Sequence, residues 1–186
     1  MDNQSATIQK NRLGLFTVNT KTLVGAVLLG LVFVLVQQIA HRIDAMINPA
    51  SVIIGGVTWA TFTGLVVLIY RQPAGLITAE IAAFTGLATG LSVLAPFFIP
   101  ANGAGSIVYS LIARKLPMNR WSHHFWAQLA TNITGNFFVA LGLYFILHLP
   151  LPVIFIAASI TTAAGVIGGT ILTKKIFESV QKAGLA

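Results

Sequence analysis

One acidic side chain stands at the edge of a long uncharged stretch of this sequence. Glu80 precedes an uncharged run from Ile81 to Ala113. A carboxylate in hydrocarbon is costly, so it usually faces a partner or a water-filled cavity. Glu80 is therefore a candidate ligand for a cationic or amine-bearing solute. The alternative is a structural role, in which it caps or bonds a neighbouring helix.

Two asparagines add neutral polar groups. Asn132 and Asn136 are one helical turn apart and hence on one face of a predicted helix. Their amides both donate and accept hydrogen bonds, which suits the edge of a heterocyclic ring. Hydrogen bonding between packed helices, worth about 1 kcal/mol in membranes, is the alternative. Other predicted helices offer further stacking or polar contacts, from Trp59, Gln38, Asn102, Ser106 and Tyr109.

No catalytic or metal-binding set is predicted. The chain has no Cys, and it lacks the HExxH, Walker A and Gly-x-Ser-x-Gly patterns. His123 and His124 adjoin Arg120 with no nearby carboxylate to orient either ring, so we expect both at the membrane interface. We therefore expect no enzyme and no cofactor in this chain. Any ATP would be used by a partner.

The scarcity of charge predicts the helices on which these residues lie. Charged residues make up 8% of the 186 residues and hydrophobic residues 56%, whereas a soluble domain carries about 25% charged residues. Uncharged runs cover 45–70, 81–113 and 121–173, each longer than the ~20 apolar residues that cross a bilayer. The pattern predicts a multi-pass protein of the cell membrane. The net charge of +7 is attributed to membrane orientation and not to nucleic acid.

Proline, glycine and charge divide the chain into six predicted spans of an all-α membrane protein. The predicted ranges are 22–39, 52–70, 73–94, a Gly-rich fourth segment ending at 113, 125–147 and 153–173. Pro96 and Pro100 are predicted to bracket a short apolar loop before the fourth span. A single six-helix domain, 22–173, thus lies between a polar cytoplasmic segment, 1–21, and a cytoplasmic tail, 174–186.

The basic residues orient this predicted bundle. With six spans, ten of the eleven Lys and Arg residues fall on one side, and only Arg42 falls on the other. Lys and Arg concentrate in cytoplasmic loops. We therefore predict that both termini are cytoplasmic.

The first span and one short motif carry a resemblance to a known family. Ala26 and Gly30 are four apart in a small-residue patch, a spacing that lets another backbone approach closely. Six spans with cytoplasmic ends, this patch and the lack of an ATPase motif resemble the S components of energy-coupling factor (ECF) vitamin transporters. The segment YRQPAGLITAE, residues 70–80, resembles the Arg-x-Pro-Gly/Ala…Ala-Glu segment of their hydroxymethylpyrimidine/thiamine-type (YkoE-like) members.

The resemblance implies a high-affinity vitamin-binding subunit that captures its solute from outside. It would dock through Ala26 and Gly30 on a transmembrane scaffold subunit, and two cytoplasmic ATPases would drive transport. The family segment matches Glu80 as a binding residue. An aminopyrimidine would also suit Asn132 and Asn136, with Trp59 or Tyr109 to stack. An S component for another vitamin (riboflavin, biotin, pantothenate or folate) and a stand-alone secondary transporter remain alternatives.

Overall fold

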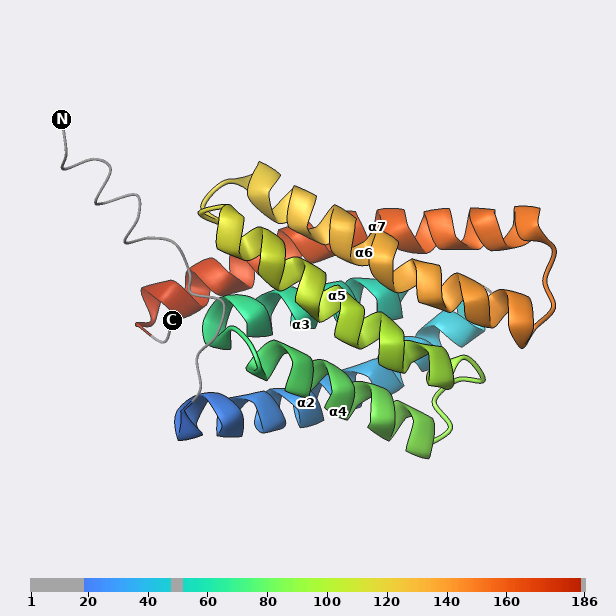
Figure 1. The fold of residues 1–186 in the computed structure, drawn as a ribbon, viewed down its shortest axis with the longest axis horizontal. Coiled ribbons are helices and arrows are strands. Elements are labelled where there is room, and N and C mark those ends of the chain that lie inside the picture. The colour runs from blue at the N-terminus through green and yellow to red at the C-terminus, as the bar shows by residue number, and fades with distance from the viewer. Residues whose placement is uncertain (1–18, 48–51, 185–186) are drawn as a thin grey trace.

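The structure is a computed structural model that describes residues 19–47 and 52–184, where six α-helices follow one another (Figure 1). They are α2 (Thr20–Ile47), α3 (Ile53–Tyr70), α4 (Ala74–Ala88), α5 (Ala95–Lys115), α6 (Trp121–Phe145) and α7 (Leu151–Lys182). The predicted all-α architecture with six helices is confirmed. Most of the predicted N-terminal segment, residues 1–18, lies outside the described residues.

The helices have the lengths and composition of a multi-pass membrane protein. Four of them, α2, α3, α5 and α7, are long and apolar enough to cross a bilayer. α4 is a shorter apolar helix of 15 residues, which at 1.5 Å per residue covers about 22 Å of the ~30 Å hydrocarbon core. α6 has 25 residues and buries a polar stripe at every fourth position: His124, Gln128, Asn132 and Asn136.

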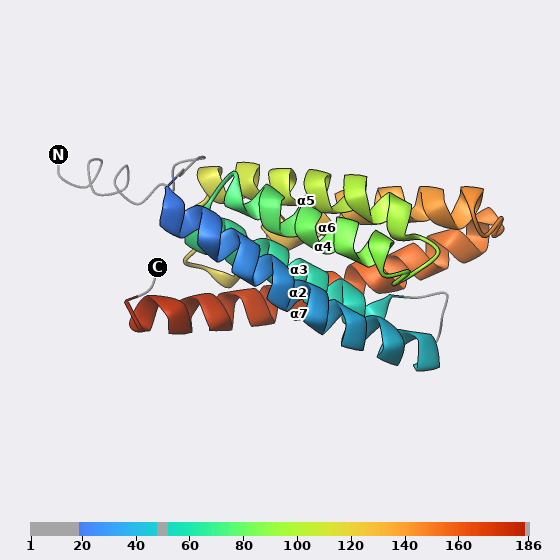
Figure 2. The same ribbon diagram turned by 90° about the horizontal axis from the view of Figure 1, so that it is seen from below.

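α3 is the central helix of the bundle. It contacts all five other helices, whereas α2 packs on α3 and α4, and α7 packs on α3 and α6. Figure 2 shows α4 and α5 on one side of α3 and α7 on the other. Residues of α3 therefore face the interior around most of the helix, and small or polar residues on it can border an internal cavity.

The two ends of the bundle differ in charge. The start of α2, the α3–α4 turn, the α5–α6 loop and the end of α7 lie at one end (Figure 1). That end, here called the basic end, carries Lys21, Arg71, Arg114, Lys115, Arg120, Lys174, Lys175 and Lys182. At the opposite end, here called the neutral end, Arg42 stands near Asp44. The predicted gathering of basic residues on one side is thus confirmed for the described residues.

Two helices extend further than predicted. α2 continues past residue 39 to Ile47, and this extension brings Asp44 to the start of α3, where its carboxylate accepts hydrogen bonds from the amides of Ile54 (2.8 Å) and Gly55 (2.7 Å). α7 continues past residue 173 to Lys182, so most of the predicted tail is helical. The α7 extension is held by Phe177, which packs in a buried cluster with residues of α3 and α5, and by Lys174, whose Nζ donates to the carbonyl of Asn119 (3.3 Å). In both cases tertiary contacts outweigh the change in local polarity.

The helix after Pro73 ends earlier than predicted, at Ala88 instead of residue 94. Gly90 has φ of 64°, a left-handed conformation that costs glycine little and commonly ends a helix. The amide of Leu91 then donates to the carbonyl of Gly86 (2.9 Å). The Thr89–Gly90 pair was the available stop signal.

The predicted apolar loop at Pro96–Pro100 is wrong, because these residues form the start of α5. Pro96 occupies the first turn, where its missing N–H costs nothing, and Pro100 removes only one intrahelical hydrogen bond. Packing explains the difference. Phe97 lies against Gly142 of α6, and Phe98 packs on a buried cluster at the neutral end.

Candidate functional site

Two adjoining chambers occupy the half of the bundle nearest the neutral end. The inner chamber has a volume of about 60 Å³ and the outer chamber about 250 Å³. His41, Asn136 and Thr161 line both, so the chambers meet there. The outer chamber is also bordered by residues 91–94 of the α4–α5 loop, which places it at the neutral end of the molecule.

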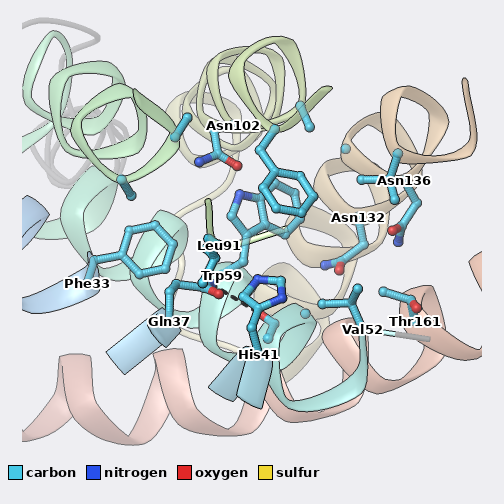
Figure 3. Close-up of a pocket in the computed structure, with 18 residues that line it drawn as sticks. Phe33, Gln37, His41, Val52, Trp59, Leu91, Asn102, Asn132, Asn136 and Thr161 are labelled. Atoms are coloured by element: carbon cyan, nitrogen blue, oxygen red, sulfur yellow. Dashed lines mark hydrogen bonds between the residues drawn. The ribbon is translucent and has the colours of Figure 1, made fainter. Parts of the chain in front are cut away.

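The inner chamber is lined by amides and aromatic rings contributed by four helices, α2, α3, α5 and α6 (Figure 3). Among the predicted binding residues, Trp59, Asn132 and Asn136 all border it. The structure therefore brings together three of the six residues of the predicted set. Its further polar or aromatic neighbours are Phe33, Gln37, His41, Phe98, Asn102 and Thr161.

Trp59 is held in a slot made by two glycines. A Cβ placed on Gly105 of α5 would lie 2.6 Å from Trp59 Cζ2, and one placed on Gly135 of α6 would lie 2.5 Å from Trp59 Cη2. Both distances are far below a carbon–carbon contact of 3.5–4.0 Å. The indole Nε1 is buried and has no hydrogen-bond partner among the described residues. The ring is thus fixed by packing while its N–H group stays free to donate.

Two amides reach the chamber from α2 and α5. Gln37 is 7% exposed, and its Nε2 donates to the backbone carbonyl of Gly55 (3.1 Å), leaving Oε1 buried without a partner among the described residues. Asn102 is equally buried, and its Nδ2 donates to the carbonyl of Ala79 (2.9 Å). Both side chains are therefore anchored through their nitrogen atoms.

The two asparagines of α6 are anchored in the same way. Asn132 is fully buried, and its Nδ2 donates to the backbone carbonyl of Gln128 (2.8 Å). Its Oδ1 lies against Gly165 of α7, where a Cβ would overlap it, and has no partner among the described residues. Asn136 Nδ2 donates to the hydroxyl of Thr162 (2.8 Å).

His41 and Asp44 stand where the chambers meet and widen. The His41 ring packs on Phe98 with centroids 5.6 Å apart. Asp44 borders the outer chamber, but each of its two carboxylate oxygens already accepts a backbone amide at the start of α3. In the described part of the chain, no other Asp or Glu borders either chamber.

The other three predicted binding residues lie outside both chambers. Glu80 is half-buried on α4, with its Oε1 against Gly103 of α5 and its Oε2 unpartnered among the described residues. Tyr109 is fully buried in an apolar cluster near the basic end. Gln38 donates to the Thr89 hydroxyl (2.8 Å) at the neutral end.

The predicted docking residues face inward. The backbone carbonyl of Ala26 accepts a hydrogen bond from the Thr78 hydroxyl of α4 (2.8 Å). A Cβ placed on Gly30 would lie 3.0 Å from Ile81, also on α4. In this structure the small-residue patch therefore serves contact between α2 and α4, and the exposed face of α2 carries other residues, among them Leu28, Leu31 and Leu35.

Sequence reasoning missed Gln37 and His41. The available signal was the buried stripe of α2, which recurs every three or four residues at Ala26, Gly30, Phe33, Gln37, Ala40 and Asp44. Adjacent helical residues point about 100° apart. Gln37 lies on this stripe, whereas the side chain of Gln38 points away from the interior.

The arrangement can bind a solute by stacking and hydrogen bonding. Within residues 19–47 and 52–184, no three His, Cys, Asp or Glu side chains lie close enough together to hold a metal ion. The chamber walls instead present neutral amides, one indole N–H and small residues that leave space. In comparisons with known proteins, no family model, no curated protein and no solved structure matches this chain.

Proposed function

We propose that this chain is the membrane-embedded, high-affinity solute-binding subunit of an ECF-type importer. The observation that carries the proposal is the amide-lined chamber around Trp59, within a bundle of long apolar helices. Binding sites typically combine apolar walls with a few well-placed polar groups. The four anchored amides and the immobilised indole provide such groups at one place.

The uneven distribution of basic residues between the two ends supports capture of the solute from outside the cell. The basic end is proposed to face the cytoplasm, because Lys and Arg concentrate on that side of membrane proteins. The outer chamber then opens toward the exterior, since it lies at the neutral end. A solute would enter the outer chamber first and reach the amides of the inner chamber from there.

The proposed solute is hydroxymethylpyrimidine or thiamine, as the resemblance of residues 70–80 implies. A pyrimidine ring could stack near Trp59 or His41 and direct its polar edge toward the amides. Glu80 is not required for this mode of binding, because it borders neither chamber. The chain itself is proposed to be a binding protein and not an enzyme. Transport would draw its energy from two ATPase subunits attached through a transmembrane scaffold subunit.

Co-purification and uptake test this proposal directly. The tagged protein should bring down a scaffold subunit and ATPases from its native membrane, and uptake of labelled hydroxymethylpyrimidine should require ATP. Accumulation of the solute by the pure chain in proteoliposomes, driven by an ion gradient alone, would instead identify a secondary transporter and defeat the proposal.

The proposed orientation has its own test. Because the chain has no Cys, single-cysteine variants at Arg42 and Asn119, both exposed, can be labelled without background. We expect a membrane-impermeant maleimide to label intact cells at position 42 and only opened cells at position 119. Labelling of both positions from the same side would contradict the orientation.

A further inference from the structure

We infer that the inner chamber selects a ligand rich in N–H donors and free of carboxylate groups, of the class of amino-substituted nitrogen heterocycles. This inference rests on the proposed function and adds to it the pattern of hydrogen-bond donors and acceptors by which the chamber recognises its ligand. The observation is that all four amides lining the chamber, Gln37, Asn102, Asn132 and Asn136, use their nitrogens on the protein framework.

The orientation of these amides is set by their partners. Gln37, Asn102 and Asn132 donate to backbone carbonyls, which can only accept. Turning any of these amides over would place two oxygen atoms against each other, so the nitrogen must face the framework. Asn136 faces a hydroxyl, which can serve either orientation.

Three of the four carbonyl oxygens consequently remain for a ligand. Gln37 Oε1 is buried without a partner among the described residues. Asn132 Oδ1 also lacks a partner there, but it lies against Gly165 of α7, which borders neither chamber, so it is not one of the three acceptors. Asn102 and Asn136 have hydrogen bonds recorded only through their nitrogen atoms in the same part of the chain. Buried polar atoms are normally satisfied, because an unmade hydrogen bond is costly. A ligand with several N–H groups would satisfy them.

Trp59 supplies the complementary group. Its buried Nε1 is a donor only, so the ligand also needs at least one acceptor, such as a ring nitrogen. An amine beside a ring nitrogen offers both N–H donors and an acceptor along a single edge. A ring carbonyl in place of the amine would set oxygen against the amide oxygens and reverse the pattern.

The described walls of the chambers carry no Lys or Arg side chain that could balance an anion. A carboxylate would lose its hydration and meet amide oxygens, which repel it. Biotin, pantothenate and folate all carry a carboxylate, so the inference disfavours three of the four alternative vitamins.

The volumes suggest how such a ligand would lie. An apolar cavity of about 150 Å³ holds benzene, whereas one water needs about 10–15 Å³. The outer chamber of about 250 Å³ can therefore accept a ring, while the inner chamber of about 60 Å³ has room for only a few atoms. The donor edge of the ligand would enter the inner chamber and the ring would lie near His41.

The experiment is calorimetric titration of the full-length purified protein with three kinds of probe. These are 4-amino-5-hydroxymethyl-2-methylpyrimidine, the same ring with a carbonyl in place of the amine, and the carboxylates biotin and pantothenate. We expect the amine to bind at least tenfold more tightly than the carbonyl compound, since about one hydrogen bond is lost and another is reversed. We expect no binding of the carboxylates.

Variants locate the effect. Asn136→Leu keeps the side-chain shape and removes the acceptor, and Gln37→Leu removes the acceptor on α2 with a side chain that is one bond shorter. Each should weaken binding of the amine about tenfold or more. Gln38→Leu is the matched control, because Gln38 is the adjacent amide and borders neither chamber. Thermal unfolding of each variant without ligand separates lost contacts from lost folding.

The outcomes distinguish the inference from the proposed function. Equal affinity for the amine and carbonyl compounds, tight binding of biotin or pantothenate, or no binding of the amine would each overturn the inference. Unchanged affinity in both Asn136→Leu and Gln37→Leu would overturn it as well. In these cases co-purified ATPases and ATP-dependent uptake of another solute would still support the proposed importer subunit, which has its own tests in co-purification, ATP dependence and uptake into proteoliposomes.

Discussion

Adding one methyl group at Gly135 should displace Trp59 and loosen the candidate site. The new Cβ would lie 2.5 Å from Trp59 Cη2 and 2.9 Å from Cζ2. Carbon atoms at optimal separation are 3.5–4.0 Å apart, so the indole must retreat by about 1 Å. Gly105 of α5 lies close to the same edge of the ring, where a Cβ would be only 2.6 Å from Cζ2. The ring therefore cannot retreat toward α5.

The expected cost follows from two opposing effects. Replacing glycine by alanine inside a helix stabilises it by about 0.5–1 kcal/mol, while overpacking a core typically costs about 1–3 kcal/mol. We expect Gly135→Ala to lower the free energy of unfolding by about 1–2 kcal/mol. For a chain of this size that corresponds to a fall in Tm of about 2–8 °C.

Ligand affinity should fall in the same variant. A shift of about 1 Å lengthens a hydrogen bond from Trp59 Nε1 beyond about 3.5 Å, where it no longer counts as one. The loss of about 1 kcal/mol corresponds to roughly fivefold to tenfold weaker binding. Calorimetry with the aminopyrimidine probe and thermal unfolding in the same detergent measure both quantities.

A double-mutant cycle tests the cause. Trp59→Phe removes the atoms Cζ2 and Cη2 that the new methyl group would meet, so Gly135→Ala should be neutral or stabilising in that background. Gly86→Ala is the control, since its nearest neighbour is the flexible end of Leu91 at 3.2 Å. The reasoning is refuted if Gly135→Ala raises Tm and leaves ligand affinity unchanged when Trp59 is present.

Three further predictions concern other parts of the bundle. Asp44→Ala removes two hydrogen bonds at the start of α3 and should cost about 1–2 kcal/mol of stability by thermal unfolding; an unchanged Tm would argue against this cap. Gly30→Leu should destabilise the fold through collision with Ile81, and normal stability with normal ligand binding would show that α2 can separate from α4. His124 lies at the basic end, outside the predicted span 125–147, and burial lowers its pKa below the ordinary value of 6.5. The unfolded chain therefore binds a proton at this residue more readily than the folded chain does. Stability should be full above about pH 6.5 and decline as the pH falls toward the folded pKa. His124→Gln should abolish that part of the decline, whereas the exposed His148→Gln should retain it.

Features that depend on composition could be predicted from the sequence. The uncharged runs located the spans, because a charged residue inside hydrocarbon is costly wherever it falls along the helix. The uneven distribution of Lys and Arg separated the two ends, because these residues concentrate on one side of a membrane protein. These arguments need no knowledge of which helix packs against which, and the structure agrees with them at the level of elements.

Features that depend on packing could not be predicted in this way. Pro96 and Pro100 are strong local signals for a break, yet packing of Phe97 and Phe98 keeps that segment helical. The choice between Gln37 and Gln38 turned on one step of helical rotation, which the buried stripe of α2 defines. Ala26 and Gly30 have the spacing of a contact surface, but spacing alone does not say whether the partner helix belongs to the same chain.

Glu80 shows why the most conspicuous residue was not the most informative one. A lone carboxylate attracts attention because its charge is costly in a membrane and therefore usually faces a partner or a water-filled cavity. Glu80 borders neither chamber, so its charge does not locate the candidate site. Neutral amides avoid the cost of a charge, and water can satisfy their oxygens until a ligand arrives. Anchoring each nitrogen on the backbone leaves Gln37 and Asn102 with acceptor oxygens and no charge. A membrane cavity can thus be selective for N–H donors without any acidic side chain of its own.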